Sequence, residues 1–443
     1  MSRYDTPIEV AQVLAKHAPK SIESILDPSV GTGALLEPLA ERLKNSAKQV
    51  VCIDIDKKAL SLVNSKFHPC FGGRIEIVCK NFLEWSVPSD NPQKHQLFDC
   101  VVMNPPFGGQ KSAYIKLDLE REMPGVGKGN RFAPIEAAFV LRSIRMLRPG
   151  GRLLSIVPAS IVSSFTTIWL RNYLMQLGAI RYVHELPRFT FGRLEARIYL
   201  FVYEKQNKQQ SIILYNHDLA KPESVIVRKE DLIPEVRFDY SFHRARHWYK
   251  TLRYCCAYLG WTQIKTIAQL YRGGFDLSAK LPNILHTCDY HDGVWYSEDR
   301  RVELKKDRSE RGIRRGDLLV KRVGRRCAYS VGRVIGHQGD ACSSCLLIIR
   351  PNVSAISIKL LFALRVLIAS DNGALLVEHG TGATYLTKNE MLEIFIPIRL
   401  SVYYSDAYAQ YRRAIELKRF DTIIAIENHV RRSLRLSIKR KQK

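Results

Sequence analysis

One stretch decides the fold of this chain: Asp99-Cys100-Val101-Val102-Met103-Asn104-Pro105-Pro106-Phe107. Apolar residues that run into prolines are typical of a buried strand that ends abruptly. Asn104 precedes a proline, which favours extended backbone at that residue, and prolines donate no backbone hydrogen bond. The stretch therefore predicts a stiff tip at the carboxyl end of a strand, where a side-chain amide, free carbonyl groups and an aromatic ring are presented together.

Such a tip carries groups that can hold the exocyclic amine of a nucleobase. This amine is a poor nucleophile because its lone pair is delocalised into the ring, so hydrogen-bond acceptors must hold it as it attacks. The side-chain oxygen of Asn104 and the carbonyl of Pro105 can each accept one N–H, and Phe107 can stack on the base. The alternative is a strand followed by a proline-rich turn with a core phenylalanine, and the tip alone leaves both interpretations open.

A glycine-bearing turn follows an earlier predicted strand. Ile25-Leu26-Asp27 leads into Pro28-Ser29-Val30-Gly31-Thr32-Gly33 and then into an amphipathic helix. The glycines allow the backbone to approach a ligand closely at a helix N-terminus. The spacing is not that of a dinucleotide motif, and Asp27 can accept an ammonium group, which favours S-adenosylmethionine as the ligand. An ordinary strand–turn–helix is the alternative.

Two further strands are predicted at 49–56 and 75–79, and ligand-type side chains stand at their ends. Asp54 lies 21 residues after Gly33, close to the spacing at which an acid binds ribose hydroxyls in doubly wound nucleoside sites. Asn81 could bond an adenine edge. Because these strands alternate with helices, the pattern predicts an α/β fold with a doubly wound, Rossmann-like parallel sheet and a ligand at its carboxyl edge.

Together with Thr6-Pro7, these motifs resemble the gamma-class DNA adenine-N6 methyltransferases of restriction–modification systems, over about residues 3–205. The resemblance implies a site-specific enzyme that transfers a methyl group from S-adenosyl-L-methionine to the N6 amine of a flipped-out adenine in duplex DNA. The implied reaction requires no metal ion. Methylation of an RNA adenine or of a glutamine side chain, and a catalytically idle DNA-binding subunit of a larger modification complex, are the alternatives.

The resemblance also assigns residues. The implied catalytic residues are Asn104, Pro105, Pro106 and Phe107. The implied cofactor-binding residues are Thr6, Asp27, Pro28, Gly31, Gly33, Asp54, Ile55, Asn81, Phe82 and Asn104. Position 81 departs from the family pattern, because it is usually Asp and is Asn in this chain, which bears on the expected contact with the adenine edge.

Two later segments are expected to meet DNA. Residues 108–131 are polar and glycine-rich and include Lys111, Lys128 and Arg131; they predict a mobile loop that closes on the DNA backbone, with a solvated loop as the alternative. In the family a late turn places an aromatic ring against the flipped base. Phe191 matches that ring best by its spacing, Phe189 is the other candidate, and core packing is equally compatible with either.

The charge is unevenly distributed along the 443 residues, whose formal net charge is +25. Residues 1–205 hold 27 Lys and Arg against 19 Asp and Glu, and the remainder holds 41 against 24. Such a balance favours nucleic acid as the partner, although a merely soluble basic protein would share it.

The back half is organised differently. We expect a catalytic domain at 1–205, a connector at 206–260, a mixed α+β domain at 261–398, and a long C-terminal helix with a basic tail at 399–443. Segments such as Ile313-Arg-Arg-Gly-Asp-Leu-Leu-Val-Lys-Arg322 and Leu392-Glu-Ile-Phe-Ile-Pro397 resemble one target-recognition half of type I restriction specificity subunits. This implies that 261–398 reads the DNA sequence. The basic residues that suit phosphate contacts, or else a solvated face, are Arg314, Arg315, Lys321 and Arg322.

Cellular context follows from what the sequence lacks. We find no apolar run long enough to span a membrane and no signal-peptide core, so we expect a cytoplasmic protein with no membrane partner. The ten cysteines are scattered and read as reduced thiols; Cys342-Ser343-Ser344-Cys345 with Cys288 and Cys327 fits no usual zinc spacing. Double-stranded DNA is the expected partner, with a cognate restriction endonuclease or defence-system subunits as further candidates, and the oligomeric state is left open.

Overall fold

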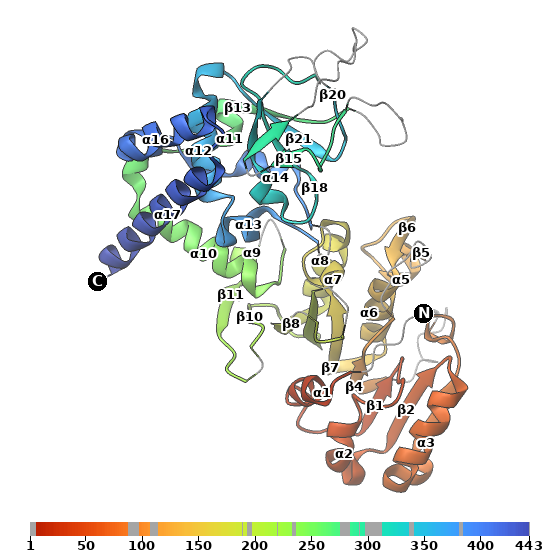
Figure 1. Ribbon diagram of the computed structural model, residues 1–443. Coiled ribbons are helices and arrows are strands. Elements are labelled where there is room, and N and C mark those ends of the chain that lie inside the picture. The colour runs from red at the N-terminus through yellow and green to blue at the C-terminus, as the bar shows by residue number, and fades with distance from the viewer. Residues whose placement is uncertain are drawn as a thin grey trace. The chain divides into compact units, whose positions relative to one another are not determined.

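The computed structural model describes residues 6–442 except 87–96, 107–113, 188, 193–196, 219, 233–235, 275–283, 292, 297–311, 336–340 and 381–383. The chain divides into two compact units, Met1–His243 and Arg244–Lys443. In Figure 1 the first unit runs from red to green and the second from green to blue.

The first unit is built on a nine-stranded sheet in the order β11-β10-β8-β9-β7-β4-β1-β2-β3. Its strands are β1 (Ser24–Asp27), β2 (Gln49–Asp54), β3 (Ile75–Cys79), β4 (Phe98–Met103), β7 (Leu147–Pro158), β8 (Gly178–Glu185), β9 (Ile198–Lys205), β10 (Ser211–Tyr215) and β11 (Ser224–Arg228). The strands β1, β2, β3, β4 and β7 run parallel, and β9 lies antiparallel between β7 and β8. The strand order reverses between β1 and β4, as in a doubly wound fold, so the predicted fold class is confirmed.

Helices cover both faces of this sheet. They are α1 (Ile8–Ala15), α2 (Ala40–Ser46), α3 (Lys57–Phe71), α4 (Phe82–Trp85), α5 (Leu119–Glu122), α6 (Ile135–Arg145), α7 (Ala159–Val162), α8 (Ile168–Leu177) and α9 (Lys229–Leu232). Along β4, Val101 and Met103 are buried in one core with α6 and α8, whereas Cys100 and Val102 are buried in the other with α1, α2 and α3. Burial on both faces explains why this strand is an unbroken apolar run.

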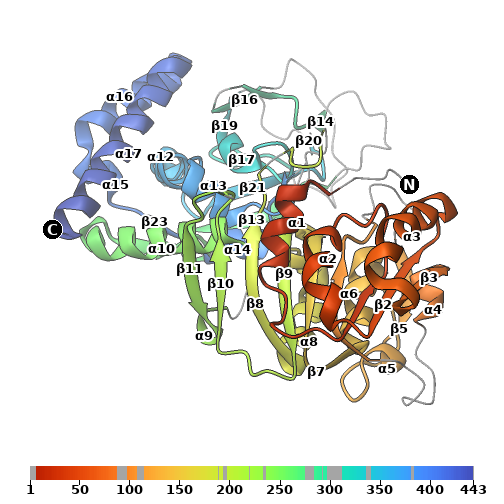
Figure 2. The ribbon, with the colours of Figure 1, turned by 90° about the horizontal axis from the view of Figure 1, so that it is seen from below.

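The sheet continues beyond the predicted edge at Lys205. Figure 2 shows β11, β10 and β8 side by side, and β10 buries Ile212 and Leu214 in the same core as α8. Glu185, at the end of β8, accepts hydrogen bonds from Ser241 N (2.9 Å) and Ser241 Oγ (2.6 Å). Ser241 lies in the first turn of α10 (Tyr240–Cys255), so the segment from 206 to the start of α10 belongs to the first unit.

A second difference concerns the glycine-rich segment after the tip. Its described part is not a loop but an antiparallel hairpin of β5 (Tyr114–Asp118) and β6 (Asn130–Pro134), with α5 between the strands. The alternation of buried and exposed residues in Tyr-Ile-Lys-Leu-Asp is the pattern of a half-buried strand. The glycines instead serve the return from α5 to β6, where Gly125 and Gly129 have φ of 78° and 69°.

The second unit contains a six-stranded, mostly antiparallel sheet in the order β13-β21-β17-β19-β16-β15. The strands of this unit are β12 (Trp261–Gln263), β13 (Ala268–Arg272), β14 (Ile284–Leu285), β15 (Tyr290–His291), β16 (Val294–Tyr296), β17 (Leu318–Lys321), β18 (Val323–Gly324), β19 (Gly332–Ile335), β20 (Ala341–Cys342), β21 (Leu346–Pro351), β22 (Thr384–Tyr385) and β23 (Phe395–Pro397). Its helices after α10 are α11 (Ile264–Ile267), α12 (Ser357–Leu367), α13 (Asp371–Val377), α14 (Lys388–Glu393), α15 (Leu400–Tyr403), α16 (Ser405–Glu416) and α17 (Phe420–Gln442). The mixed α+β composition matches the expectation for 261–398.

The predicted long C-terminal helix is two helices. The break between α16 and α17 lies at Lys418, whose φ of 53° is left-handed and incompatible with a continuous helix. Both helices contribute to the core around α12, with Tyr411 and Val430 fully buried.

Within the described residues, no single helix is long and apolar enough to cross a membrane. By length and composition only, one pair of helices bent by 99°, α12 with its preceding turn and then α13, would be long and apolar enough. Most apolar residues of α12 are buried in the core.

Candidate active site

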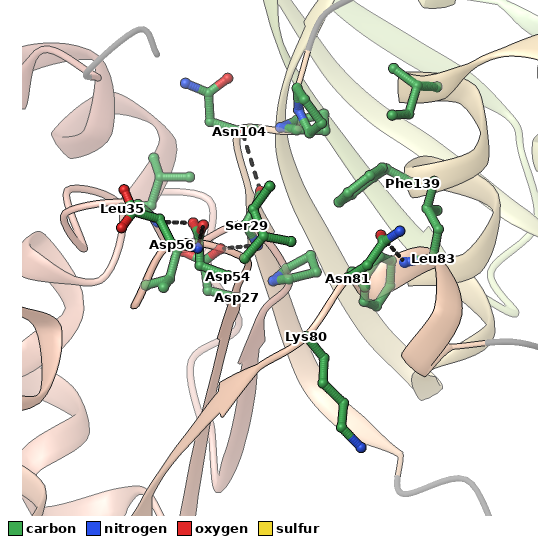
Figure 3. A pocket seen from close by; sticks show the side chains of 18 of the residues that line it. Asp27, Ser29, Leu35, Asp54, Asp56, Lys80, Asn81, Leu83, Asn104 and Phe139 are labelled. Atoms are coloured by element: carbon green, nitrogen blue, oxygen red, sulfur yellow. Dashed lines mark hydrogen bonds between the residues drawn. The ribbon is translucent and has the colours of Figure 1, made fainter. Parts of the chain in front are cut away.

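A cavity of about 480 Å³ opens at the carboxyl ends of β1, β2, β3 and β4 (Figure 3). It is lined by Thr6, Asp27, Pro28, Ser29, Val30, Gly31, Thr32, Ala34, Leu35, Asp54, Ile55, Asp56, Lys80, Asn81, Phe82, Leu83, Asn104, Pro105, Pro106, Ile115, Ile135 and Phe139. All of the implied cofactor-binding residues except Gly33 are among them. Residues that are distant in sequence therefore meet in one place, because the carboxyl ends of parallel strands lie at the same edge.

The acidic end of the cavity is formed by β1 and β2. Asp27 is 1% exposed, and its Oδ1 accepts a hydrogen bond from Ser29 N at 3.0 Å. The pKa of Asp27 is raised to about 8, chiefly by burial; the hydrogen bond from Ser29 N opposes this shift, and the neighbouring carboxylate of Asp54 adds to it. A buried carboxyl group with a raised pKa is poised to meet a cationic group, which would stabilise its ionised form.

Asp54 shapes the glycine turn. Its two carboxylate oxygens accept hydrogen bonds from Gly31 N at 2.9 Å and from Asp56 N at 3.0 Å, and Figure 3 shows these carboxylates grouped beside the turn. Asp56 caps α3 by accepting hydrogen bonds from the backbone N–H groups of Lys58 and Ala59. The carboxylate of Asp54 therefore both stabilises the turn and lines the cavity.

Gly33 has a different role from the one implied. It does not line the cavity; it has φ of +80°, and a Cβ at this position would lie 2.4 Å from Cε2 of Phe67 on α3. Only glycine allows this backbone conformation and this close approach of the ring. Gly33 thus positions the turn by packing.

The opposite end of the cavity is more apolar. Phe82 is 2% exposed and packs against Phe139 of α6, with ring centroids 5.2 Å apart. Asn81 caps α4: its Oδ1 accepts from Leu83 N at 3.0 Å, and its Nδ2 donates to Glu84 at 3.0 Å. Both polar groups of the Asn81 side chain are used in this cap (Figure 3). Asn81 can therefore contact a planar ring as part of the cavity wall.

The tip itself is held from two sides. Asn104 Nδ2 donates to Thr6 Oγ1 at 3.0 Å, and Ser29 Oγ donates to the backbone carbonyl of Asn104 at 3.1 Å. The Asn104 Oδ1 atom is buried and has no hydrogen-bond partner within the described part of the chain. A buried amide oxygen without a partner is costly, so this atom is a hydrogen-bond acceptor available to a ligand. Pro105 and Pro106 line the cavity directly after it.

Several predicted residues cannot be placed at the site. Phe107 and Lys111 lie outside the described residues. Phe191 is 6% exposed within the core that contains Leu186 and Ile198, which is the core-packing alternative, whereas Phe189 is 56% exposed. Phe189 also has φ of 65°, a backbone conformation that is unusual for a bulky residue and often accompanies function. The exposed ring therefore makes Phe189 the better candidate for stacking.

The predicted basic contacts separate into exposed and structural groups. Lys128, Arg131, Arg314 and Arg315 are exposed. Arg131 lies over the ring of Trp169 on α8, 5.4 Å from its centroid. In the second unit, Lys321 lies 5.6 Å from the ring centroid of Tyr290, and Arg322 donates to the carbonyl of Ser344 at 2.7 Å.

Sequence reasoning missed the roles of two hydroxyl groups. Thr6 orients the Asn104 amide, and Ser29 anchors its backbone. The position of Ser29 directly after Asp27-Pro28 carries no local signal for a contact that spans 75 residues. Among the described residues, no group of three or more His, Cys, Asp or Glu side chains could hold a metal ion.

The acceptors and walls of the cavity define the ligand that it fits. The buried carboxyl group of Asp27 suits a cationic group at one end, the Asp54 side of the turn suits hydroxyl groups, and Ile55, Phe82 and Phe139 suit a planar ring. The unpartnered oxygen of Asn104 marks where a second molecule would present an N–H group.

Comparison with known proteins shows similarity to DNA methyltransferases. The family model described as N-6 DNA Methylase matches residues 1–248. The chain is 28% identical over 193 residues to the type II methyltransferase M.TthHB8I of Thermus thermophilus, covering 40% of this chain and 39% of that protein. It is 23% identical over 239 residues to the type II methyltransferase M.HincII of Haemophilus influenzae, covering 52% and 42%.

The chain thus spans about two fifths of the length of these curated relatives. Among solved structures, the type IIG restriction endonuclease BpuSI aligns with a TM-score of 0.47 and 15% identity, over 90% of this chain and 59% of that chain.

Proposed function

Because the chain belongs to the N-6 DNA methylase family, we propose that it transfers a methyl group to the N6 amine of an adenine in duplex DNA. The family match covers the unit that contains the cavity, and the cavity has the acceptor that an adenine amine requires. The single observation that carries the proposal is the buried Asn104 Oδ1, which lacks a partner among the described residues and lies beside Pro105.

The cofactor is S-adenosyl-L-methionine, and the residues present fit it. Asp27 would hold the ammonium of its methionine part, Asp54 its ribose hydroxyls, and the apolar wall at Phe82 its adenine ring. When bound, the cofactor supplies a sulfonium methyl group as the electrophile. Asn81 would contribute through the cap of α4, which fixes the backbone of that wall.

The chain's own contribution to chemistry is acceptor placement. Asn104 Oδ1 and the carbonyl of Pro105 accept the two N–H groups of the target amine, so its lone pair is left free to attack. Thr6 holds the amide so that its oxygen, and not its nitrogen, faces the amine. These acceptors also stabilise the positive charge that develops on the nitrogen, and the excess proton is then lost to solvent.

An adenine inside a duplex cannot reach this cavity, so the target must be extruded. We propose that Phe107 and the exposed ring of Phe189 stack on the extruded base. Residues 261–398 would read the target sequence, with Arg314 and Arg315 on phosphates. A cognate restriction endonuclease or defence-system subunits are the proposed protein partners.

The test is methyl transfer from labelled S-adenosyl-L-methionine into plasmid DNA that lacks adenine methylation. Wild-type protein should produce labelled N6-methyladenine, and Asn104→Ala should abolish the label. Asn64→Ala, an exposed asparagine on α3, is the matched control and should match the wild type. Cofactor affinity, measured by calorimetry, should survive in both variants.

Label that appears in RNA or in a protein, with none in duplex DNA, would overturn the substrate. Tight DNA binding without transfer to any acceptor would replace the proposal with an idle DNA-binding subunit. Transfer that persists in Asn104→Ala would remove the tip from the mechanism.

A further inference from the structure

The β5–β6 hairpin has one face that is fastened to the first unit. Leu117 and Ala133 are 1% and 0% exposed in the core with α6, and Ile115 lines the cavity beside Pro105 and Pro106. Arg131, on the same face as Ala133, lies over Trp169 of α8. The hairpin is therefore a fixed wall of the active site.

The other face is exposed and carries two aromatic rings beside the polar side chains of Lys116, Asp118 and Asn130. Phe132 is 72% exposed and Tyr114 is 57% exposed. Lys116 is exposed and is the cross-strand partner of Phe132 in the register of the hairpin. Side chains alternate between faces along a strand, so Tyr114, Lys116 and Phe132 share this outward face. We call these three residues the hairpin triad.

Two neighbouring large rings that stay mostly exposed within the described residues indicate an interaction surface. The chemistry of the triad fits one class of partner. Aromatic rings stack on nucleobases of any sequence, and a lysine between them contacts phosphate. The triad also lies close to the proposed active site, because Tyr114 directly precedes the cavity-lining Ile115 in β5, so one face of the hairpin forms the cavity wall and the other face carries the triad.

An extruded base leaves a gap in its duplex, and proteins that distort DNA commonly fill such gaps with apolar side chains. We propose that the hairpin triad is a DNA wedge: Phe132 and Tyr114 stack on the bases that remain in the duplex beside the extruded adenine, and Lys116 contacts the adjoining phosphate. This inference rests on the proposed function, since it assigns a role in extrusion to a wall of the same site.

The test uses two duplexes that contain the target sequence, which is first read from plasmid methylated by the wild-type protein. In one duplex the target adenine is paired, and in the other it lies opposite an abasic site, where extrusion costs less. On the paired duplex, Phe132→Ala and Tyr114→Ala should each lower kcat/KM about tenfold to a hundredfold, as expected for loss of one stacked base. On the abasic duplex most of this loss should disappear.

Three controls make the outcome specific. Phe132→Tyr keeps the ring and should retain activity. Ile226→Ala removes an apolar side chain that is 67% exposed on β11 and should have no effect. Cofactor affinity by calorimetry and the thermal unfolding midpoint should be unchanged in all variants, because the triad faces away from the cavity.

Wild-type rates for Phe132→Ala and Tyr114→Ala on the paired duplex would overturn the wedge while leaving the proposed function intact. A loss of equal size on both duplexes would also overturn it, since stacking in the gap would then not be the cause. If the wild-type protein methylates no DNA, the proposed function fails first and this inference fails with it.

Discussion

At the scale of single residues, the geometry around Asn104 separates orientation from ligand binding. The resemblance assigns Thr6 to the cofactor, whereas the structure gives its hydroxyl to Asn104 Nδ2 at 3.0 Å. Thr6→Val should therefore slow methyl transfer about 2- to 10-fold, which is the rate effect expected for the loss of one hydrogen bond. The cofactor dissociation constant should stay unchanged. Single-turnover rates and calorimetry measure the two effects separately, and Thr6→Ser should restore the rate. A weakened cofactor affinity with an unchanged rate would show that Thr6 binds the cofactor and does not act by orienting Asn104.

The raised pKa of Asp27 predicts a pH dependence with a definite sign. Burial raises this pKa to about 8, so the carboxyl group is mostly protonated in the free protein at neutral pH. An ammonium ligand binds the ionised form, so cofactor affinity should rise from about pH 6 towards pH 8, near where the ligand's own amine begins to lose its charge. Calorimetric titration across this range checks it.

Asp27→Asn is the control for this prediction. It removes the titrating group, so affinity should be lower and nearly constant between these pH values. The same shift makes the free protein less stable as pH rises from about 4 to about 8, because the unfolded chain releases the proton at the lower value. An affinity of the wild type that falls with pH over this window would contradict the assignment of Asp27 to a cationic group.

Which single residues could be anticipated depends on how local their signals are. Asp27, Asp54 and Asn104 stand at strand ends, so their positions at one sheet edge follow from the fold, and all three line the cavity. Spacing favours Phe191 over Phe189, whereas only the packed core shows that Phe191 is the buried ring and Phe189 the exposed one. The sequence also does not reveal that Asn81 caps a helix, because the hydrogen-bond partners of its side chain depend on where α4 begins.

At the scale of elements, the turn between β1 and α2 depends on its contact with α3. Gly33→Ala should destabilise the protein by about 1–3 kcal/mol, because the new Cβ meets the Phe67 ring and a left-handed backbone is strained. Cofactor affinity should fall as well, since the turn carries Gly31 and its bond to Asp54. Denaturant unfolding and calorimetry measure the two effects.

Gly73→Ala is the matched change for this comparison. A Cβ at Gly73 has nothing within 4 Å and the residue has no left-handed backbone, so stability and affinity should stay within about 0.5 kcal/mol of the wild type. Equal effects of the two substitutions would mean that the contact with Phe67 is not what requires glycine at position 33.

Elements were predictable where the hydrophobic period was unambiguous. The strands that end in Asp27, Cys79 and Met103 appear where the apolar runs place them, and β2 ends at Asp54, two residues before its predicted end. The hairpin was missed because glycines and charges dominate the composition of 108–131 and hide two five-residue alternations. The C-terminal helix was predicted as continuous because its apolar period crosses Lys418, and periodicity does not register a backbone break.

At the scale of the whole molecule, charge is divided unequally between the compact units. Residues 244–443 hold 36 Lys and Arg against 18 Asp and Glu, so most of the positive field belongs to the second unit. DNA affinity should therefore fall steeply as salt rises, with a slope set by the number of phosphate contacts. Arg315→Gln should lower that slope by about 1 if the exposed guanidinium meets phosphate.

Lys44→Gln removes the same charge from the end of α2, an exposed position away from the cavity edge, and should leave the slope unchanged. Fluorescence anisotropy with a labelled duplex at several salt concentrations measures all three proteins. Identical slopes for wild type and Arg315→Gln would exclude that residue from the phosphate contacts.

The hydrogen bonds from Ser241 to Glu185 have a practical consequence for recombination between relatives. A chimaera joined at Lys205, where composition suggests a seam, would strip β10 from β8 and leave Glu185 without the donors it has now. A joint placed after the first turn of α10 keeps both. Inside a helix, one inserted or deleted residue rotates every later side chain by about 100°, so a joint there must preserve the helical phase as well as the sequence.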